Sequence, residues 1–165
     1  MRISVLGAGG WGTALSIILH LNGHRVTLWE YKRNYARTLK KSRENKLYLP
    51  KIKIPDEIEI THSLEDACTK QHMIVLAVPS QFIRSVLQKI KKMNFQDTYF
   101  VSVAKGIENN TFLTVSQIIK DELTGVSEDF IGVLSGPSHA EEVGRKIPTA
   151  VVKVRFSFFK LIILF

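Results

Sequence analysis

Short runs of apolar residues recur along the chain, and longer amphipathic stretches lie between them. Continuous apolar runs bounded by turn signals are typical of strands that are buried on both faces of a parallel sheet. The clearest is HMIVLAV at residues 72–78, which ends at Pro79. The pattern predicts strands at residues 2–6, 25–29, 57–60, 72–78, 98–103, 130–134 and 149–154.

Apolar residues spaced three and four positions apart predict helices between these strands. The helices are expected at residues 13–21, 32–43, 80–92, 111–123 and, after a turn, within 136–144. In the helix of residues 80–92, the positions expected to share the apolar face are Phe82, Val86, Leu87 and Ile90.

Local signals add two further expectations. Ser63 and Asp66 have the spacing of a capping box, which predicts the start of a short helix. Residues 45–55 contain Pro50 and Pro55, and this punctuation favours a loop.

Strands and helices therefore alternate, which predicts an α/β fold with a doubly wound parallel sheet. Right-handed crossovers place helices on both faces of such a sheet. Ligands bind such sheets beyond the carboxyl ends of the strands. We therefore look for chemistry in the segments that follow the predicted strands.

The composition fits one globular domain in a reducing compartment. The chain has 165 residues, of which 45% are hydrophobic and 23% charged, and it holds one cysteine. One cysteine forms no internal disulfide, and no Cys/His cluster with metal-ligand spacing is present, so we expect no metal site. The apolar run at 156–165 is too short for a membrane span. These features favour a cytoplasmic protein.

The net charge of +8 is concentrated in one region. Residues 31–53 contain nine Lys or Arg and one acid, Glu44. Such a stretch is typical of a solvated basic surface, and it would also attract an anionic ligand. A nucleic-acid binder is the less favoured alternative, because the tyrosines there form no stacking motif.

The segment GAGGWG at residues 7–12 carries the first chemical signal. It follows a predicted strand and opens a predicted helix, which is the context of a dinucleotide-binding turn. Gly7 would permit the tight turn, Gly9 would let the pyrophosphate approach the backbone, and Gly12 would let helix and strand pack closely. The helix N-terminus would then face the phosphates. The motif predicts a Rossmann-like dinucleotide-binding domain.

Glu30 lies at the end of the second predicted strand, 23 residues after Gly7. A carboxylate there can accept hydrogen bonds from ribose hydroxyls, which favours NAD over NADP. Lys32 and Arg33 follow directly, and cations at that place could instead hold a 2′-phosphate. NAD is therefore the expected cofactor, with NADP left open.

Two later segments also follow predicted strands. Lys105 stands between a strand and Gly106, where its ammonium could reach a phosphate or a carbonyl, although a surface lysine is an equal alternative. Ser138 lies in SGPSHAEEV (135–143), where a strand ends and a helix begins, and it could bind an anion or simply cap the helix.

Five blocks follow one another along the chain: GAGGWGTAL (7–15), NKLYLP (45–50), VP-S (78–80), AKGIE (104–108) and SGPSHAEEV (135–143). Together these ordered blocks resemble NAD(P)-dependent glycerol-3-phosphate dehydrogenase of the bacterial type. The resemblance covers residues 1 to about 152.

The resemblance also implies roles for individual residues. Lys105 would reach both cofactor and substrate, and Gly136 and Ser138 would line the substrate. The implied cofactor contacts, beside Gly7, Gly9, Gly12 and Glu30 of the dinucleotide motif, are Gly10, Trp11, Tyr31, Tyr48, Lys105 and Ala140.

The family continues for about as many residues again into an all-helical domain, which is absent here. That domain carries the lysine that acts as proton donor and acceptor, so no catalytic residue is expected in this chain. The expected division is a dinucleotide-binding domain at 1–152 and an atypical apolar tail at 153–165. A truncated gene product, a frameshifted end and a cloned fragment would all explain the tail.

The resemblance implies an oxidoreductase that interconverts dihydroxyacetone phosphate and sn-glycerol 3-phosphate for phospholipid synthesis, inactive as this fragment. The alternatives are a non-catalytic dinucleotide-binding module and a related reductase of the ketopantoate type. A homo-oligomer is left open, and nucleic-acid and membrane partners are not expected.

Overall fold

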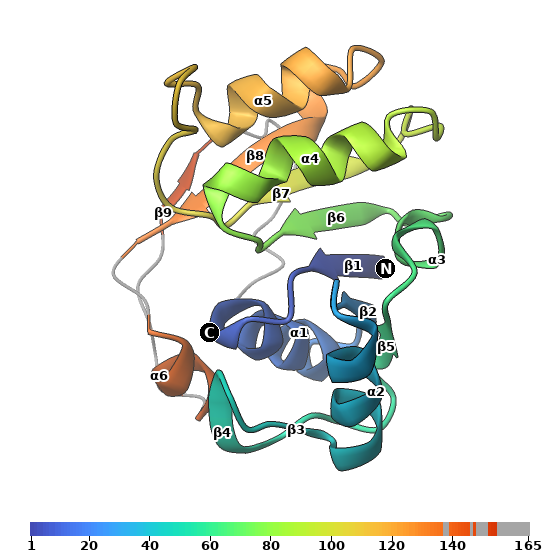
Figure 1. Ribbon diagram of the computed structural model, residues 1–165, viewed down its shortest axis with the longest axis vertical. Coiled ribbons are helices and arrows are strands. Elements are labelled where there is room, and N and C mark those ends of the chain that lie inside the picture. Colours follow the sequence, from blue (N-terminus) through green and yellow to red (C-terminus); the bar gives the residue numbers. More distant parts are fainter. Residues whose placement is uncertain (137–138, 146, 148–151, 155–165) are drawn as a thin grey trace.

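A seven-stranded sheet runs through the molecule (Figure 1). The structure is a computed structural model and describes residues 1–136, 139–145, 147 and 152–154. Six neighbouring strands are parallel, and β9 pairs antiparallel with β8 at one edge. In spatial order the strands are β5 (Glu59–Thr61), β2 (Arg25–Trp29), β1 (Arg2–Leu6), β6 (Met73–Leu76), β7 (Tyr99–Ser102), β8 (Ile131–Ser135) and β9 (Val152–Val154).

Helices cover both faces of this sheet, as the alternating pattern predicts (Figure 1). The α-helices are α1 (Gly10–Leu21), α2 (Arg33–Ser42), α3 (Leu64–Cys68), α4 (Ser80–Ile90), α5 (Val115–Glu122) and α6 (Ala140–Gly144), and η1 (Glu128–Phe130) is a short 3₁₀ turn. One core lies between the sheet and α1 and α2, and includes Leu15 and Leu39. A second core, which includes Phe100 and Ile118, lies under α3, α4 and α5. The predicted doubly wound α/β fold is confirmed.

The prediction of a loop at residues 45–55 is wrong. A small antiparallel hairpin lies there instead, made of β3 (Glu44–Asn45) and β4 (Leu49–Lys53). Its strands are short and mostly polar, so they lack the apolar run by which a strand is recognised. Pro50 is tolerated because β3 is the only partner of β4 within the described residues, which makes β4 an edge strand.

Two helices begin three or more residues away from the expected start. The helix expected from residue 13 begins at Gly10, because the glycine turn itself forms the first helical turn. The helix expected from residue 111 begins at Val115, where Thr114 and Gln117 form a capping box. The cap expected at Ser63 is confirmed, since its hydroxyl accepts a hydrogen bond from the Asp66 backbone N–H at 3.2 Å.

The apolar face expected for α4 is wrong at one position. Phe82 is 59% exposed, and Ile83 takes its place in the core beside Val86, Leu87 and Ile90. The spacing of the run allows either residue to face inward, so sequence periodicity does not choose between them. The strand expected at 149–154 is described only as Val152–Val154, because 149–151 lie outside the described residues. The expected division after residue 152 falls inside this strand.

The chain reverses its direction of strand addition between β1 and β6. From β1 it adds β2 and β5 on one side, then returns to place β6 against the other side of β1. In such sheets the crevice between these two strands, beyond their carboxyl ends, is the usual ligand position. No helix within the described ranges is long and apolar enough to cross a membrane.

Candidate functional site

The turn after β1 is built by close backbone approaches. Gly7 has φ +120°, and a Cβ on it would lie 2.9 Å from the backbone of Ala77 and Val78, which follow β6. A Cβ on Gly12 would overlap the Gly7 carbonyl oxygen. Glycines at these two positions therefore let the β1–α1 turn lie directly against the end of β6, at the place where the sheet reverses its order.

The N-terminus of α1 lies beside this turn. Gly9 is its N-cap residue, has no side chain to cap the helix, and would place a Cβ with no neighbour within 4 Å among the described residues. The first N–H groups of a helix have no partner within it, and the helix dipole adds positive potential there. No acidic side chain occupies the first turn of α1. The arrangement suits an anionic group such as a pyrophosphate.

Three of the predicted cofactor residues meet at this helix start. A Cβ on Gly10 would lie 2.5 Å from the Tyr48 carbonyl oxygen and 3.4 Å from the Ala140 Cβ. The β3–β4 hairpin and α6 thus both reach the start of α1, from segments distant in the sequence (Figure 1). The Tyr48 side chain is half exposed and packs edge-to-face on Tyr35, with ring centroids 6.2 Å apart.

Asn45 joins the hairpin to the glycine turn, and sequence reasoning did not single it out. Its side chain is fully buried, and its Nδ2 donates to the Ala8 carbonyl oxygen and to Thr13 Oγ1, both at 2.8 Å. Its Oδ1 accepts from the Tyr35 hydroxyl at 2.6 Å and from the Tyr48 N–H at 3.2 Å. The bonds to Ala8 and Thr13 join residues more than 30 positions apart, so no local pattern reveals them.

Glu30 follows β2, next to the glycine turn, because the Gly7 N–H donates to the Trp29 carbonyl oxygen at 3.0 Å. The Glu30 side chain is buried, and its Oε1 accepts from the Lys32 backbone N–H at 2.9 Å. Burial raises the pKa of this carboxyl, and the Lys32 backbone N–H and ammonium act in the opposite direction. Tyr31 is 65% exposed, and the Lys32 Nζ lies 5.4 Å from its ring centroid.

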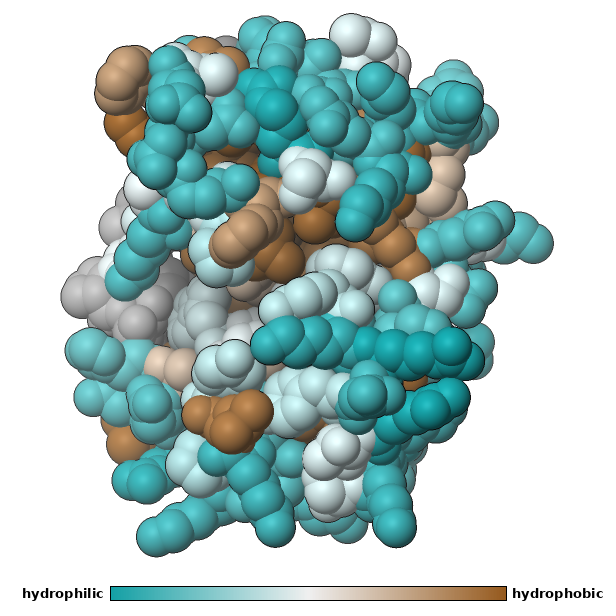
Figure 2. Space-filling model, in the orientation of Figure 1, coloured by the Kyte–Doolittle hydropathy of each residue, from teal (hydrophilic) through white to brown (hydrophobic). Residues whose placement is uncertain are grey.

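Basic side chains dominate the surface beside Glu30. Figure 2 shows hydrophilic residues over the lower part of the molecule, where Figure 1 places α2 and the β3–β4 hairpin. The exposed cations of this region are Lys32, Arg33, Arg37, Lys40, Lys41, Lys46, Lys51 and Lys53. Arg43 differs from them, because its Nη1 donates to the Ile58 carbonyl oxygen at 2.7 Å. The surface is solvated, as the charge pattern predicts, and it adjoins the glycine turn.

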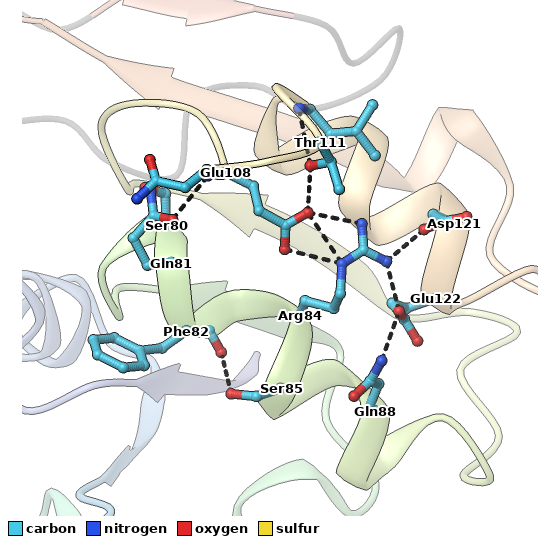
Figure 3. A network of polar contacts seen from close by, with 12 residues as sticks. Ser80, Gln81, Phe82, Arg84, Ser85, Gln88, Glu108, Thr111, Asp121 and Glu122 are labelled. Atoms are coloured by element: carbon cyan, nitrogen blue, oxygen red, sulfur yellow. Dashed lines mark hydrogen bonds and ion pairs between the residues drawn. The ribbon is translucent and has the colours of Figure 1, made fainter.

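Lys105 is exposed and follows β7, in a loop that the start of α4 holds. Gln81 makes two contacts with this loop: its Nε2 donates to the Ile107 carbonyl oxygen at 2.7 Å, and its Oε1 accepts from the Asn109 N–H at 2.8 Å. Figure 3 shows Ser80 and Gln81 beside the loop. Gln81 thus holds the backbone at Ile107 and Asn109, shortly after the exposed Lys105.

An ion-pair network anchors the same loop on its other side (Figure 3). Arg84 of α4 binds both carboxylate oxygens of Glu108, with Nε 2.9 Å from Oε1 and Nη2 2.9 Å from Oε2. Its Nη1 donates to Asp121 and Glu122 of α5. The hydrogen bonds from Arg84 and Thr111 lower the pKa of Glu108, and the three carboxylates raise the pKa of Arg84. The network joins α4, α5 and the Lys105 loop.

The structure gives less detail for three of the remaining predicted residues. Trp11 lies in the first turn of α1, partly buried against the core. Gly136 follows β8 with φ +148°, whereas Ser138 lies outside the described residues. Among the residues that are described, no group of three or more His, Cys, Asp or Glu could hold a metal ion.

The family model of NAD-dependent glycerol-3-phosphate dehydrogenase N-terminus matches residues 2–155. Glycerol-3-phosphate dehydrogenase [NAD(P)+] of Fusobacterium nucleatum is 47% identical over 152 residues, covering 92% of this chain and 45% of that protein. The enzyme of the same name from a Thermoanaerobacter species is 47% identical, covering 92% and 44%. The crystal structure of glycerol-3-phosphate dehydrogenase from Coxiella burnetii has a TM-score of 0.82 and 30% identity, covering 91% and 45%.

The chain therefore spans less than half the length of these relatives. The family model describes the N-terminus of the enzyme, and the matched residues 2–155 include the glycine turn, the β3–β4 hairpin and the Lys105 loop of this chain.

Proposed function

This chain belongs to the NAD-dependent glycerol-3-phosphate dehydrogenase family, whose N-terminal part it matches, and from this premise we propose that it binds NAD(P). The observation that carries the proposal is the N-terminus of α1, where Gly9 leaves space among the described residues and the first helical turn holds no acidic side chain. That geometry binds a pyrophosphate through backbone N–H groups and the helix dipole.

The other predicted residues support the same dinucleotide. Glu30, beside the turn, accepts hydrogen bonds from the adenosine ribose hydroxyls and thereby favours NAD, while the nearby basic surface attracts the anionic cofactor. Gly10, Trp11, Tyr31, Tyr48 and Ala140 surround the cofactor. Lys105 extends from its anchored loop to cofactor and substrate, and Gly136 and Ser138 line the substrate.

The whole enzyme of which this chain is the cofactor-binding part interconverts dihydroxyacetone phosphate and sn-glycerol 3-phosphate. The cofactor supplies the hydride chemistry, and the protein supplies placement and electrostatic stabilisation. The Lys105 ammonium orients the substrate and offsets negative charge that develops on the carbonyl oxygen. The proton donor belongs to a further domain, so residues 1–152 bind the cofactor without completing the reaction, and we assign no part of the site to residues 153–165.

We propose that this activity is cytoplasmic. A chain with one cysteine stays reduced there, and sn-glycerol 3-phosphate formed there is available for phospholipid synthesis. Association of copies into a homo-oligomer is compatible with this role and is not needed for dinucleotide binding.

Binding and turnover are tested on one sample. We expect fluorescence titration to show saturable NADH binding, and we expect no NADH oxidation when dihydroxyacetone phosphate is added at high protein concentration. Loss of a general acid costs about 10²–10⁴ in rate, and loss of substrate positioning costs more.

Absence of NADH binding would contradict the proposed function. Turnover that disappears in Lys105→Ala would show that this chain holds its own proton donor. Binding without turnover fits the cofactor half of the enzyme and also a non-catalytic dinucleotide-binding module. Adding the C-terminal part of a relative separates the two, because only the cofactor half of an enzyme would then gain activity.

A further inference from the structure

We propose that Asn45 is a positioning residue for dinucleotide binding, which holds the glycine turn and the Tyr48 loop in one arrangement. The inference rests on the proposed function and adds to it a residue that need not touch the cofactor. It is carried by the hydrogen bonds of a single buried amide.

The Asn45 side chain uses its full hydrogen-bonding capacity. An amide offers two N–H donors and two acceptor positions, and all four are occupied by Ala8, Thr13, Tyr35 and Tyr48. Two partners belong to the glycine turn and α1, and two belong to the hairpin side. Because Asn45 is 0% exposed, water cannot replace a lost partner without rearrangement.

The bond to Ala8 controls the direction of the Gly9 N–H. The Ala8 carbonyl and the Gly9 N–H belong to one planar trans peptide, so they point in opposite directions. Asn45 draws the carbonyl oxygen inward at 2.8 Å, and the Gly9 N–H is thereby turned away from the buried amide. In the part of the chain that the structure describes, no atom would lie within 4 Å of a Cβ on Gly9. The amide thus keeps the phosphate-binding N–H groups at the turn correctly aimed.

The two bonds to Asn45 Oδ1 hold the Tyr48 segment of the β3–β4 hairpin against the start of α1. Asn45 Oδ1 accepts from the Tyr48 N–H, and the Tyr48 carbonyl oxygen lies against the Gly10 position. The Tyr35 hydroxyl, bound to the same Oδ1, holds the ring on which Tyr48 packs. The half-exposed Tyr48 ring is thereby held on the hairpin side of the helix start.

A neutral amide is the group this position requires. An aspartate would place a carboxylate oxygen 2.8 Å from the Ala8 carbonyl oxygen, where the amide now donates. It would also put a negative charge behind the turn that binds a pyrophosphate. Both effects oppose binding, while the shape of the side chain stays the same.

The test is the affinity for NAD⁺, measured by calorimetry on the parent and on Asn45→Asp at a temperature well below unfolding. The mispaired contact with the Ala8 carbonyl and the added charge predict binding weaker by roughly 10- to 100-fold, whereas the Thr13 hydroxyl can donate to the new carboxylate. Asn94→Asp is the matched control, because it makes the same chemical change on an exposed loop before β7. We expect the control to bind NAD⁺ like the parent.

A pH profile separates positioning from a general loss of stability. Protonation of the carboxylate that Asn45→Asp introduces restores one donor toward Ala8, so the affinity of this variant relative to the parent should rise as the pH falls. The neighbouring Tyr35 stays protonated there, because burial raises the pKa of its hydroxyl, and Glu30, which acts on Tyr35 from the end of β2, titrates in the parent as well. The ratio of the NAD⁺ affinities of Asn45→Asp and the parent therefore reports the titration of residue 45 alone.

Equal NAD⁺ affinity of parent and folded Asn45→Asp, or a constant ratio across pH, would overturn the inference. If circular dichroism shows that Asn45→Asp is unfolded, the NAD⁺ affinity of Tyr35→Phe tests the inference instead. This variant removes one hydrogen bond to Asn45 Oδ1. It should weaken NAD⁺ binding about 2- to 10-fold, and unchanged affinity would overturn the inference. A parent that does not bind NAD⁺ would instead refute the proposed function.

Discussion

At the scale of single residues, neighbouring glycines of one motif serve different purposes. A Cβ at Gly9 would meet no atom of the described residues within 4 Å, whereas one at Gly12 would overlap the Gly7 carbonyl oxygen. We predict that Gly9→Val folds with little loss of stability and binds NADH at least about 10-fold more weakly, because valine occupies the pyrophosphate position. Circular dichroism and fluorescence titration measure the two effects separately.

Gly12→Ala is the contrasting variant and should lose several kcal/mol of stability, as overpacking against backbone does. NADH binding by Gly9→Val equal to that of the parent would place the phosphate site elsewhere. The motif predicts these glycines from sequence because their roles depend on local spacing. Roles for Asn45 and Gln81 were not predicted, because their hydrogen-bond partners Ala8 and Asn109 lie far away in the sequence. Only the folded chain brings each residue to its partner.

At the scale of elements, the spacing of apolar residues and the turn signals predict most of the sheet and its helices. The strand at Arg25–Trp29 matches its prediction at both ends, because its apolar run is bounded by a clear turn. The β3–β4 hairpin was missed, since its polar edge strands are stabilised by Asn45 and by packing of Leu49 in the core rather than by an apolar run. Helix starts at Gly10 and Val115 depend on capping geometry, which apolar periodicity does not report.

The Arg84–Glu108 pair makes an element-scale prediction about acid stability. Arg84 and Thr111 lower the pKa of Glu108 in the folded chain below its usual value of 4.5. A lowered folded pKa contributes stability above the unfolded value, and that stability is lost as pH falls from about 5 toward the folded pKa. We therefore expect Glu108→Gln to show a shallower loss of unfolding free energy than the parent between about pH 6 and about pH 3.

Urea unfolding at a series of pH values measures this difference. The exposed Asp97→Asn, on the loop before β7, serves as the charge-matched control and should follow the parent curve. Parallel curves for the parent and Glu108→Gln would mean that the network contributes no pH-dependent stability.

At the scale of the whole molecule, the single cysteine reports on opening of the fold. Cys68 is 2% exposed in α3, within the core that α4 and α5 share, and burial raises the pKa of its thiol to about 12. The thiolate is the reactive form, so a disulfide reagent should react with the native chain far more slowly than with the unfolded chain at neutral pH. Reaction then requires a state in which the core around α3 is open.

Dinucleotide binding should slow this reaction, although the glycine turn contacts the other core. The two cores share the sheet, so an opening of the whole domain exposes Cys68 and destroys the turn together. A ligand that binds only the folded state then reduces the open population by the factor 1 + [L]/Kd, about 100-fold at about 100 times Kd. We expect saturating NAD⁺ to slow thiol labelling by this factor and to leave labelling of the urea-unfolded chain unchanged. If NAD⁺ stabilises the chain against urea but leaves native labelling as fast as before, α3 opens by itself, and the two faces of the sheet unfold independently.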